Sequence, residues 1–109
     1  MTTNNNIIDT IDNLVKTNDV ILFMKGNAEM PLCGFSARVV AILNHLQVPF
    51  ADINVLESNE MRQGIKDYTD WPTIPQLYIK GNFIGGCDLI KDMFEKGELK
   101  SLLKDNNLL

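Results

Sequence analysis

One cysteine in this sequence lies where protein structure makes a thiol reactive. Cys33 follows an apolar run typical of a buried strand (20–25) and begins a stretch with helical spacing of apolar residues (35–46). Unpaired N–H groups and the positive end of the helix dipole stabilise a thiolate at such a position. Lys25 adds a cation if the loop folds back, whereas Glu29 opposes it. We therefore expect Cys33 to have a lowered pKa.

Ser36 stands three positions after Cys33, where a redox protein of the C-x-x-C type has its second cysteine. A hydroxyl cannot form a disulfide, so this segment holds no intramolecular dithiol couple. A thiolate without a neighbouring thiol is suited to be a metal ligand. The alternative is that Cys33 is an inert buried cysteine, but Pro31 and Gly34 on either side place it in a loop.

The composition limits the class of protein. A chain of 109 residues with 45% hydrophobic and 22% charged residues is typical of one globular domain, which we expect to span residues 1–109. The net charge of −4 argues against general affinity for nucleic acid or an anionic membrane. Cys33 and Cys87 are too few for a disulfide scaffold and form no closely spaced zinc pair.

The first residues, MTTNNNIIDTIDNL, do not have the pattern of a targeting segment. They lack a basic start followed by an apolar run, and they lack the arginines of a transit peptide. No apolar stretch approaches the roughly 18 residues of a membrane span. These features predict a reducing cytosol as the compartment.

Hydrophobic periodicity predicts the elements that position these residues. The first two strands flank a helix and should be parallel, whereas the last two form an antiparallel hairpin. We therefore expect an α/β fold, a four-stranded mixed sheet with helices on both faces, ordered from about residue 5 to about residue 105 with frayed ends. The expected elements are a helix over 7–16, a strand over 20–25, a helix over 35–46, a strand over 50–56, a helix capped by Ser58, a hairpin turning at Gly81-Asn82, a helix capped by Asp88 and, after a break at Gly97, a short last helix.

Four motifs in register over about 100 residues resemble a known family. They are similar, in order and spacing, to the motifs of the single-domain, CGFS-type monothiol glutaredoxins, and they read MKG, PLCGFS, WPTIPQLYIKG and IGGCD. The resemblance implies the thioredoxin fold, with Pro75 a cis proline facing Cys33. It also implies glutathione and a [2Fe–2S] cluster as cofactors. Two chains and two glutathiones would then supply the four cluster thiolates, so we expect a cluster-bound homodimer and a monomeric apo form.

Glutathione carries two carboxylates, so its site needs cations and free backbone N–H groups. Lys25 is a candidate for the glycine carboxylate, and the N–H groups after Gly86 open a helix that can bind an anion. The resemblance implies that this segment binds the γ-glutamyl end and that the backbone of Ile74 pairs with the cysteinyl part. The predicted set is Cys33 as catalytic residue and metal ligand, with Lys25, Phe35, Arg62, Lys66, Thr73, Ile74, Pro75, Gly86, Cys87 and Asp88 as binding residues.

Several of these residues also have a structural interpretation. Arg62 and Lys66, four apart on one helix face, are either a carboxylate site or a solvated face with Asp70 neutralising Lys66. The Gly85-Gly86 pair permits close approach of a ligand or forms a bulge. Cys87 is either a small core residue, which we favour, or a disulfide partner of Cys33. Trp71 either closes over a bound ligand or seals the core, and His45 is interpreted as a solvated surface residue and a poor ligand.

Three functions fit these observations. The first is a glutathione-ligated [2Fe–2S] carrier that transfers clusters to apo iron–sulfur proteins, and the resemblance implies a possible BolA-type partner. The second is a glutathione-dependent thiol–disulfide oxidoreductase that removes glutathione through Cys33 alone. The third is an interaction module with an inactive cysteine. The CGFS sequence favours the first, because the resemblance implies weak reductase activity.

Overall fold

The two central strands of the sheet are buried on both of their faces, so helices must cover both sides of the sheet. The computed structural model describes residues 5–109, so the expectation for residues 1–4 lies outside its described part. The elements are α1 (Asn5–Thr17), β1 (Val20–Met24), α2 (Gly34–His45), β2 (Ala51–Asn54), the 3-10 turn η1 (Val55–Glu57), α3 (Asn59–Thr69), β3 (Gln76–Ile79), β4 (Asn82–Gly85), α4 (Cys87–Glu95) and α5 (Glu98–Asp105).

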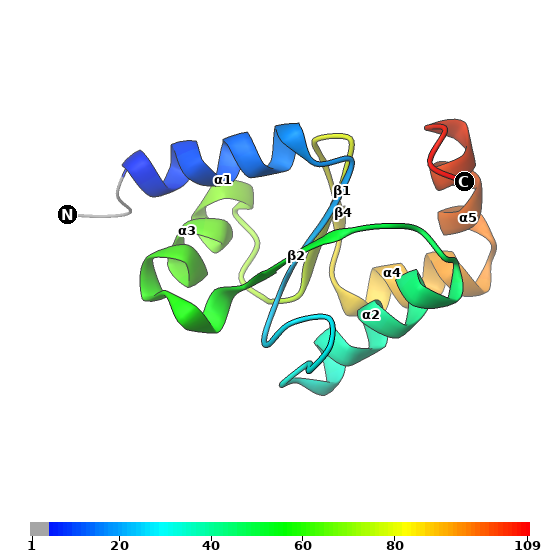
Figure 1. Ribbon diagram of the computed structural model, residues 1–109, viewed down its shortest axis with the longest axis horizontal. Helices are drawn as coiled ribbons and strands as arrows, with labels where there is room; N and C mark the ends of the chain where they lie inside the picture. Colours follow the sequence, from blue (N-terminus) through cyan, green and yellow to red (C-terminus); the bar gives the residue numbers. More distant parts are fainter. Residues whose placement is uncertain (1–4) are drawn as a thin grey trace.

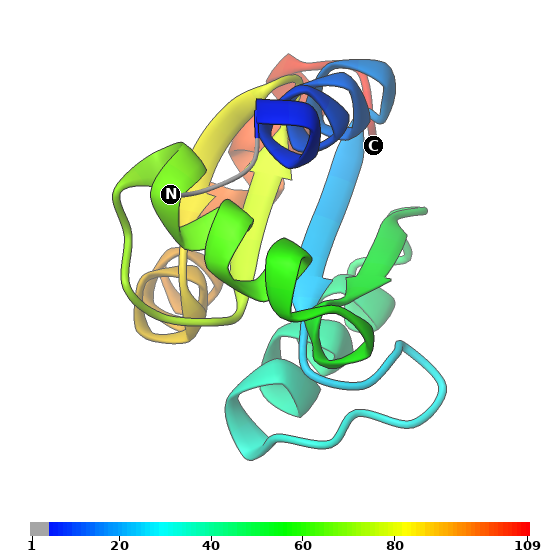
Figure 2. The ribbon, with the colours of Figure 1, turned by 90° about the vertical axis from the view of Figure 1, so that its left-hand side faces the viewer.

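The sheet has the strand order β2-β1-β3-β4. β1 pairs with β2 in parallel and with β3 antiparallel, and β3 pairs with β4 antiparallel. Figures 1 and 2 show α1 and α3 on one face of this sheet and α2 and α4 on the other, with α5 beside α4. The α/β fold with a four-stranded mixed sheet and helices on both faces is confirmed.

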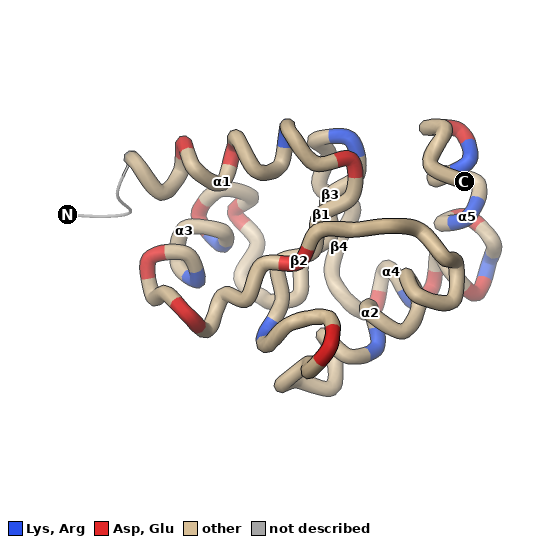
Figure 3. Tube along the Cα trace, in the orientation of Figure 1, with Lys and Arg blue, Asp and Glu red and all other residues tan. Residues whose placement is uncertain are grey.

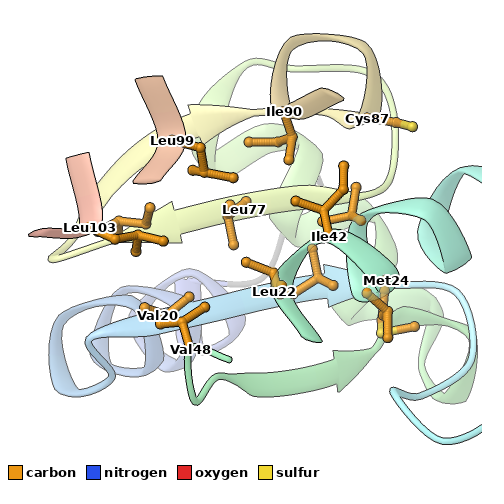
Figure 4. Close-up of a cluster of buried hydrophobic side chains, with 14 residues drawn as sticks. Val20, Leu22, Met24, Ile42, Val48, Leu77, Cys87, Ile90, Leu99 and Leu103 are labelled. Carbon is orange, nitrogen blue, oxygen red and sulfur yellow. The ribbon is translucent and has the colours of Figure 1, made fainter. Parts of the chain in front are cut away.

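Side chains of β1 alternate between two apolar cores. Val20, Leu22 and Met24 point towards α2, α4 and α5, and they pack with residues such as Leu77. Figure 4 shows this larger core, with Cys87 at its edge. The side chains between them in the strand pack with α1 and α3 on the opposite face. A strand buried on both faces reads as a continuous apolar run, which is why VILFM shows no alternation of polarity.

The hairpin turn lies one residue earlier than the sequence predicts. Ile79 pairs with Asn82, so the two turn residues are Lys80 and Gly81, with φ of 51° and 81°. Two positive φ values in succession give the twist that suits a two-residue hairpin. The Gly81-Asn82 assignment was therefore wrong, because Asn82 already belongs to β4. Lys80 is fixed by its own N–H, which donates to the Asp19 carbonyl at 2.8 Å.

Two of the predicted helix starts have different outcomes. Ser58 caps α3 as predicted, and its hydroxyl accepts a hydrogen bond from the Met61 N–H at 3.1 Å. Asp88 does not cap α4: the N-cap residue is Gly86, and Asp88 is the second residue of the helix. The helix begins sooner because Gly86 has the extended backbone of a cap and its carbonyl accepts from Ile90 N–H.

One strand ends earlier than predicted, and one break between helices lies where it was predicted. The strand expected over 50–56 ends at Asn54, whose side-chain oxygen accepts from the Leu56 N–H and starts η1. Gly97, with φ of 77°, separates α4 from α5 as expected. After α5 the chain turns back, and the Leu108 N–H donates to the Leu103 carbonyl at 2.9 Å.

Charged residues lie mainly on the helices and loops (Figure 3). Among the strands, only β2 carries a charge, Asp52, and β2 is an edge strand. Within residues 5–109, no helix is both long and apolar enough to span a membrane.

Candidate functional site

A groove of about 760 Å³ brings most of the predicted site residues together. It lies between the start of α2, the segment before β3 and the start of α4. Of the eleven predicted residues, ten line this groove: Lys25, Cys33, Phe35, Lys66, Thr73, Ile74, Pro75, Gly86, Cys87 and Asp88.

Arg62 is the predicted residue that the structure does not bring to the groove. It is exposed on α3, one turn before Lys66, and it is not among the groove-lining residues. Lys66 and Lys25 both line the groove and are partly buried. No salt bridge within the described part of the chain involves either lysine. The alternative in which Asp70 neutralises Lys66 is therefore not supported among the described residues, and Lys25 and Lys66 line the groove without an ion pair.

Cys33 is the N-cap residue of α2, in the position predicted from the sequence. Its backbone is extended (φ −147°, ψ 135°), and its carbonyl accepts the first helical hydrogen bond from Ala37 at 2.9 Å. The backbone N–H of Ser36 lowers the pKa of the Cys33 thiol, helped by the Phe35 N–H, the charge of Lys25 and the Ser36 hydroxyl. Partial burial opposes this shift but does not cancel it. The arrangement therefore favours the nucleophilic and metal-binding thiolate form.

The side chain of Ser36 is fully buried and has a structural partner. Its hydroxyl oxygen accepts a hydrogen bond from the Lys25 backbone N–H at 3.1 Å. This bond joins the first turn of α2 to the residue that follows β1. Ser36 therefore fixes Lys25 and Cys33 relative to each other, in addition to leaving the segment without a second thiol.

The loop between β1 and α2 is held by two side chains of β2. Figure 2 shows this loop leaving the end of β1 and returning to α2. Asp52 accepts from the Ala28 N–H at 2.8 Å, and Asn54 accepts from the Gly26 N–H at 3.0 Å. Gly26 has φ of 83°, and a Cβ there would lie 2.5 Å from the Met30 carbonyl oxygen. The loop that delivers Cys33 is thus tightly folded rather than open.

Pro75 and the start of α4 form the opposite side of the groove. The Ile74–Pro75 peptide bond is cis, as the family resemblance implies. A Cβ on Gly86 would lie 3.3 Å from the Pro75 carbonyl oxygen, so the backbone of the α4 N-cap approaches the cis proline closely. Trp71 packs against Phe83 with ring centroids 5.7 Å apart and keeps 43% of its surface exposed.

Cys87 is buried and belongs to the larger core as well as to the groove lining. Burial raises the pKa of its thiol, which is the opposite of the shift at Cys33. Both cysteines are free thiols in the structure. The interpretation of Cys87 as a small core residue agrees with this placement, and its thiol ionises less readily than that of Cys33.

The groove also contains residues that were not in the predicted set. Trp71 and Gly85 were noted from the sequence but left out of that set, Gly85 as half of a glycine pair that permits close approach of a ligand or forms a bulge. The others are apolar and carry no signal of their own, although Leu89 stands on the polar side of α4 and is 48% exposed. The additional lining residues are Trp71, Pro72, Phe83, Ile84, Gly85 and Leu89.

Comparisons with known proteins agree with this geometry. The Glutaredoxin family model matches residues 20–84. The chain is 56% identical to "Probable monothiol glutaredoxin 2" of Rickettsia typhi, over 91% of this chain and 89% of that protein. It is similar to the solution structure of a monomeric truncated mutant of Trypanosoma brucei 1-C-Grx1, with 38% identity, a TM-score of 0.86, and coverage of 94% of this chain and 93% of that one. A buckwheat glutaredoxin–glutathione complex has a TM-score of 0.83, covering 96% and 94% of the two chains at 22% identity, a likeness of fold alone.

Proposed function

This chain belongs to the glutaredoxin family as a monothiol member with the thioredoxin fold, and from that premise we propose that it binds glutathione beside Cys33 and carries a [2Fe–2S] cluster for transfer to apo iron–sulfur proteins. One observation carries the proposal. A thiol with a lowered pKa lies in the same groove as two lysines that form no salt bridge with any described carboxylate.

The groove offers partners for both ends of glutathione. Lys25 and Lys66 suit the glycine carboxylate. At the other end, the first hydrogen bond of α4 runs from Ile90 to Gly86, so the N–H groups before Ile90 have no partner within the helix. Those of Cys87 and Asp88 would bind the γ-glutamyl carboxylate, and the Asp88 side chain would bind its ammonium group. The sulfur of a tripeptide held at both ends would then lie beside Cys33.

The thiolates of one chain are too few for a cluster. A [2Fe–2S] cluster usually takes four thiolates. Cys33 is the groove thiol with a lowered pKa, and residues 5–109 contain no group of three or more potential metal-ligating side chains. The remaining ligands would come from glutathione and a second chain, as two Cys33 thiolates and two glutathione thiolates. The cluster-bound form is then a homodimer and the apo form a monomer, with a BolA-type protein able to replace one chain in a reducing cytosol.

Anaerobic reconstitution tests this proposal. Wild type, Cys33→Ser and Cys87→Ser are supplied with iron and sulfide, with and without glutathione, and their iron content and molecular mass are measured. We expect a dimer with a cluster in wild type and in Cys87→Ser only when glutathione is present, and no cluster in Cys33→Ser. A wild-type cluster that survives removal of glutathione, or one lost equally in Cys87→Ser, would show that Cys87 supplies a ligand.

The lowered pKa of Cys33 also favours a second function, a glutathione-dependent oxidoreductase. The Cys33 thiolate would attack the glutathione sulfur of a mixed disulfide, and the target thiolate would leave. A glutathione thiolate would then attack the Cys33–glutathione disulfide, releasing oxidised glutathione and restoring Cys33. In sum, the mixed disulfide and one glutathione thiol give the free target thiol and oxidised glutathione, so glutathione is the only reductant needed.

The Ser36→Cys variant separates the two functions. A second thiol should raise turnover of a small glutathione mixed disulfide or form an internal disulfide, and it should weaken cluster retention. Wild type that turns over the mixed disulfide as fast as Ser36→Cys would give the oxidoreductase precedence over the cluster carrier.

A further inference from the structure

The side chain of Gln76 is a fully buried amide directly behind the groove. Gln76 is the first residue of β3 and follows the cis proline Pro75. Its exposed fraction is 0%, and Ser36 and Gln76 are the two buried polar residues of the described chain. Burying an amide is costly unless its donors and acceptor are paired.

All of the hydrogen-bonding groups of this amide have partners. Gln76 Nε2 donates to the carbonyl oxygens of Trp71 and Thr73, each at 3.2 Å. Gln76 Oε1 accepts from the hydroxyl of Tyr78 at 2.9 Å and lies 3.0 Å from that of Thr69, whose single hydrogen is shared with the Ile65 carbonyl at 3.1 Å. Both N–H donors and the oxygen of the amide therefore have partners.

The segment that Gln76 contacts has no regular secondary structure to pair its backbone carbonyls. Residues 71–75 lie between α3 and β3 outside any helix or strand, and two of them are prolines without an N–H group. Their carbonyls need donors from elsewhere. The Trp71 N–H is bonded to the Lys66 carbonyl at 3.1 Å, which fixes the beginning of the segment. The Gln76 amide fixes its middle, from behind the groove.

We propose that Gln76 is a positioning residue for glutathione, an inference that rests on the proposed function above. By holding the carbonyls of Trp71 and Thr73, it sets the position of the Ile74 backbone that pairs with the cysteinyl part of the ligand. The thiolate of Cys33 depends on other groups, namely Ser36 and Lys25. Gln76 thus controls glutathione affinity without controlling thiolate reactivity.

The Gln76→Met variant tests this separation, because methionine keeps the length of the side chain but can neither donate to the two carbonyls nor accept from the hydroxyls. Three quantities are measured in reduced protein: affinity for glutathione by NMR titration, the rate of Cys33 alkylation by iodoacetamide, and the fluorescence of Trp71, the single tryptophan of the chain. We expect glutathione to bind about tenfold more weakly, the order of effect of one or two lost buried hydrogen bonds. The alkylation rate should stay within about twofold of wild type, a change worth less than 0.5 kcal/mol by the same conversion, while Trp71 becomes more accessible to acrylamide.

Tyr68→Phe is the matched control. It removes a hydroxyl that bonds Asp12 at 2.7 Å, away from the groove lining, and it should leave all three measurements at their wild-type values. Glutathione affinity in Gln76→Met equal to wild type would overturn the proposal. A parallel fall in affinity and alkylation rate would also overturn it, because it would mean a general loss of structure.

A measurement on wild type tests the same point without any change to the core. The side-chain amide hydrogens of Gln76 should exchange with solvent far more slowly than those of Gln63 and Gln47, which are exposed. Exchange as fast as at Gln63 would overturn the proposal. Wild type that does not bind glutathione would refute the proposed function itself, whereas tight binding unaffected by Gln76→Met would refute only the role of Gln76.

Discussion

The backbone N–H of Lys25 donates to the hydroxyl oxygen of Ser36 over 3.1 Å, and this bond ties the end of β1 to the first turn of α2. Cys33 lies on the chain between these two residues, so the bond closes the loop that presents the thiol. The serine is fully buried, and a buried N–H that loses its acceptor is costly. The residue that replaces the second cysteine of a dithiol motif thus has a structural role of its own.

Removing the Ser36 hydroxyl should weaken both the fold and the thiolate. In Ser36→Ala we expect a loss of roughly 1–3 kcal/mol in the free energy of unfolding, because the Lys25 N–H is left unpaired. The pKa of Cys33 should rise, since the hydroxyl helps to stabilise the thiolate. Urea unfolding and the pH dependence of alkylation measure the two effects. Ser101→Ala, at an exposed site on α5, is the control and should change neither.

The two cysteines should differ in their response to pH. The pKa of Cys33 is lowered, first by the Ser36 N–H, and that of Cys87 is raised by burial. Iodoacetamide should therefore modify Cys33 with a midpoint below about 8.5, the value of a free cysteine, and should leave Cys87 unmodified until higher pH. Mass spectrometry of Cys87→Ser and Cys33→Ser assigns each reaction. A Cys33 midpoint at or above the free-cysteine value would contradict the lowered pKa.

The same shifts give opposite contributions to stability. Cys33 has a folded pKa below its unfolded value, so its contribution is present above the unfolded pKa and is lost as pH falls through the folded pKa. Cys87 has a raised folded pKa, so its contribution is present below the unfolded pKa and is lost as pH rises through the folded pKa. In Cys33→Ser the unfolding free energy should fall more steeply with rising pH in the alkaline range than in wild type.

Asn54 should be important for the loop that holds Cys33. Its Oδ1 accepts from the N–H groups of Gly26 and Leu56, both at 3.0 Å. Asn54→Ala leaves two donors without this acceptor and should cost about 1–3 kcal/mol in unfolding free energy, with broadened NMR signals in the loop. Asn54→Asp keeps an oxygen acceptor and should retain most of the stability. Equal stability losses in the two variants would show that the oxygen is not what matters.

The hydrogen bond between Tyr68 and Asp12 predicts pH dependence at both extremes. Burial and this bond raise the pKa of Tyr68 to about 12 from 10.0, so its contribution to stability is present below pH 10.0 and is lost as pH rises to about 12. The bond to Tyr68 lowers the pKa of Asp12 from 3.8, so the contribution of Asp12 is present above pH 3.8 and is lost as pH falls through the lowered value.

Ultraviolet titration of tyrosinate tests the alkaline side. The chain has two tyrosines, and burial raises the pKa of Tyr78 to about 12 as well. Wild type should therefore show no tyrosinate at pH 10.0 and a joint transition near pH 12. Tyr68→Phe should keep the transition at half its amplitude. A midpoint near 10.0 in folded wild type would exclude the bond to Asp12 as drawn.

Local patterns were sufficient to predict the elements and the position of Cys33, because period, caps and prolines act within a few residues. The side-chain ties could not be predicted in this way. Asn54 and Gly26 are 28 positions apart in the chain, and Asp52 and Ala28 are 24 apart, so their bonds exist only after β2 has paired with β1. From the sequence, Gln76 is predicted to be an ordinary strand residue, because its bonds to Trp71 and Thr73 exist only once residues 71–75 have folded over it.

The case of Arg62 and Lys66 shows a second limit. Helical spacing correctly places both on one side of α3, but it does not tell which turn of the helix reaches the groove. That depends on where α3 ends, and Lys66 lies in its last turn. The hairpin turn was misplaced for a similar reason, since Gly81 can occupy either turn position and only the pairing of Ile79 with Asn82 decides.

The groove is built from two parts of the polypeptide, which are joined where β1 pairs antiparallel with β3. The part that includes β1 contributes Lys25, Cys33 and Phe35, and the part that includes β3 contributes Pro75 and Gly86. Pairing strands so distant in sequence requires closure of a long loop before any contact rewards it. The thiol and the wall of the groove opposite it are therefore brought together only by the pairing of β1 with β3. Selectivity for one ligand over other thiols and metals depends on this long-range pairing, and no single segment of the chain carries it.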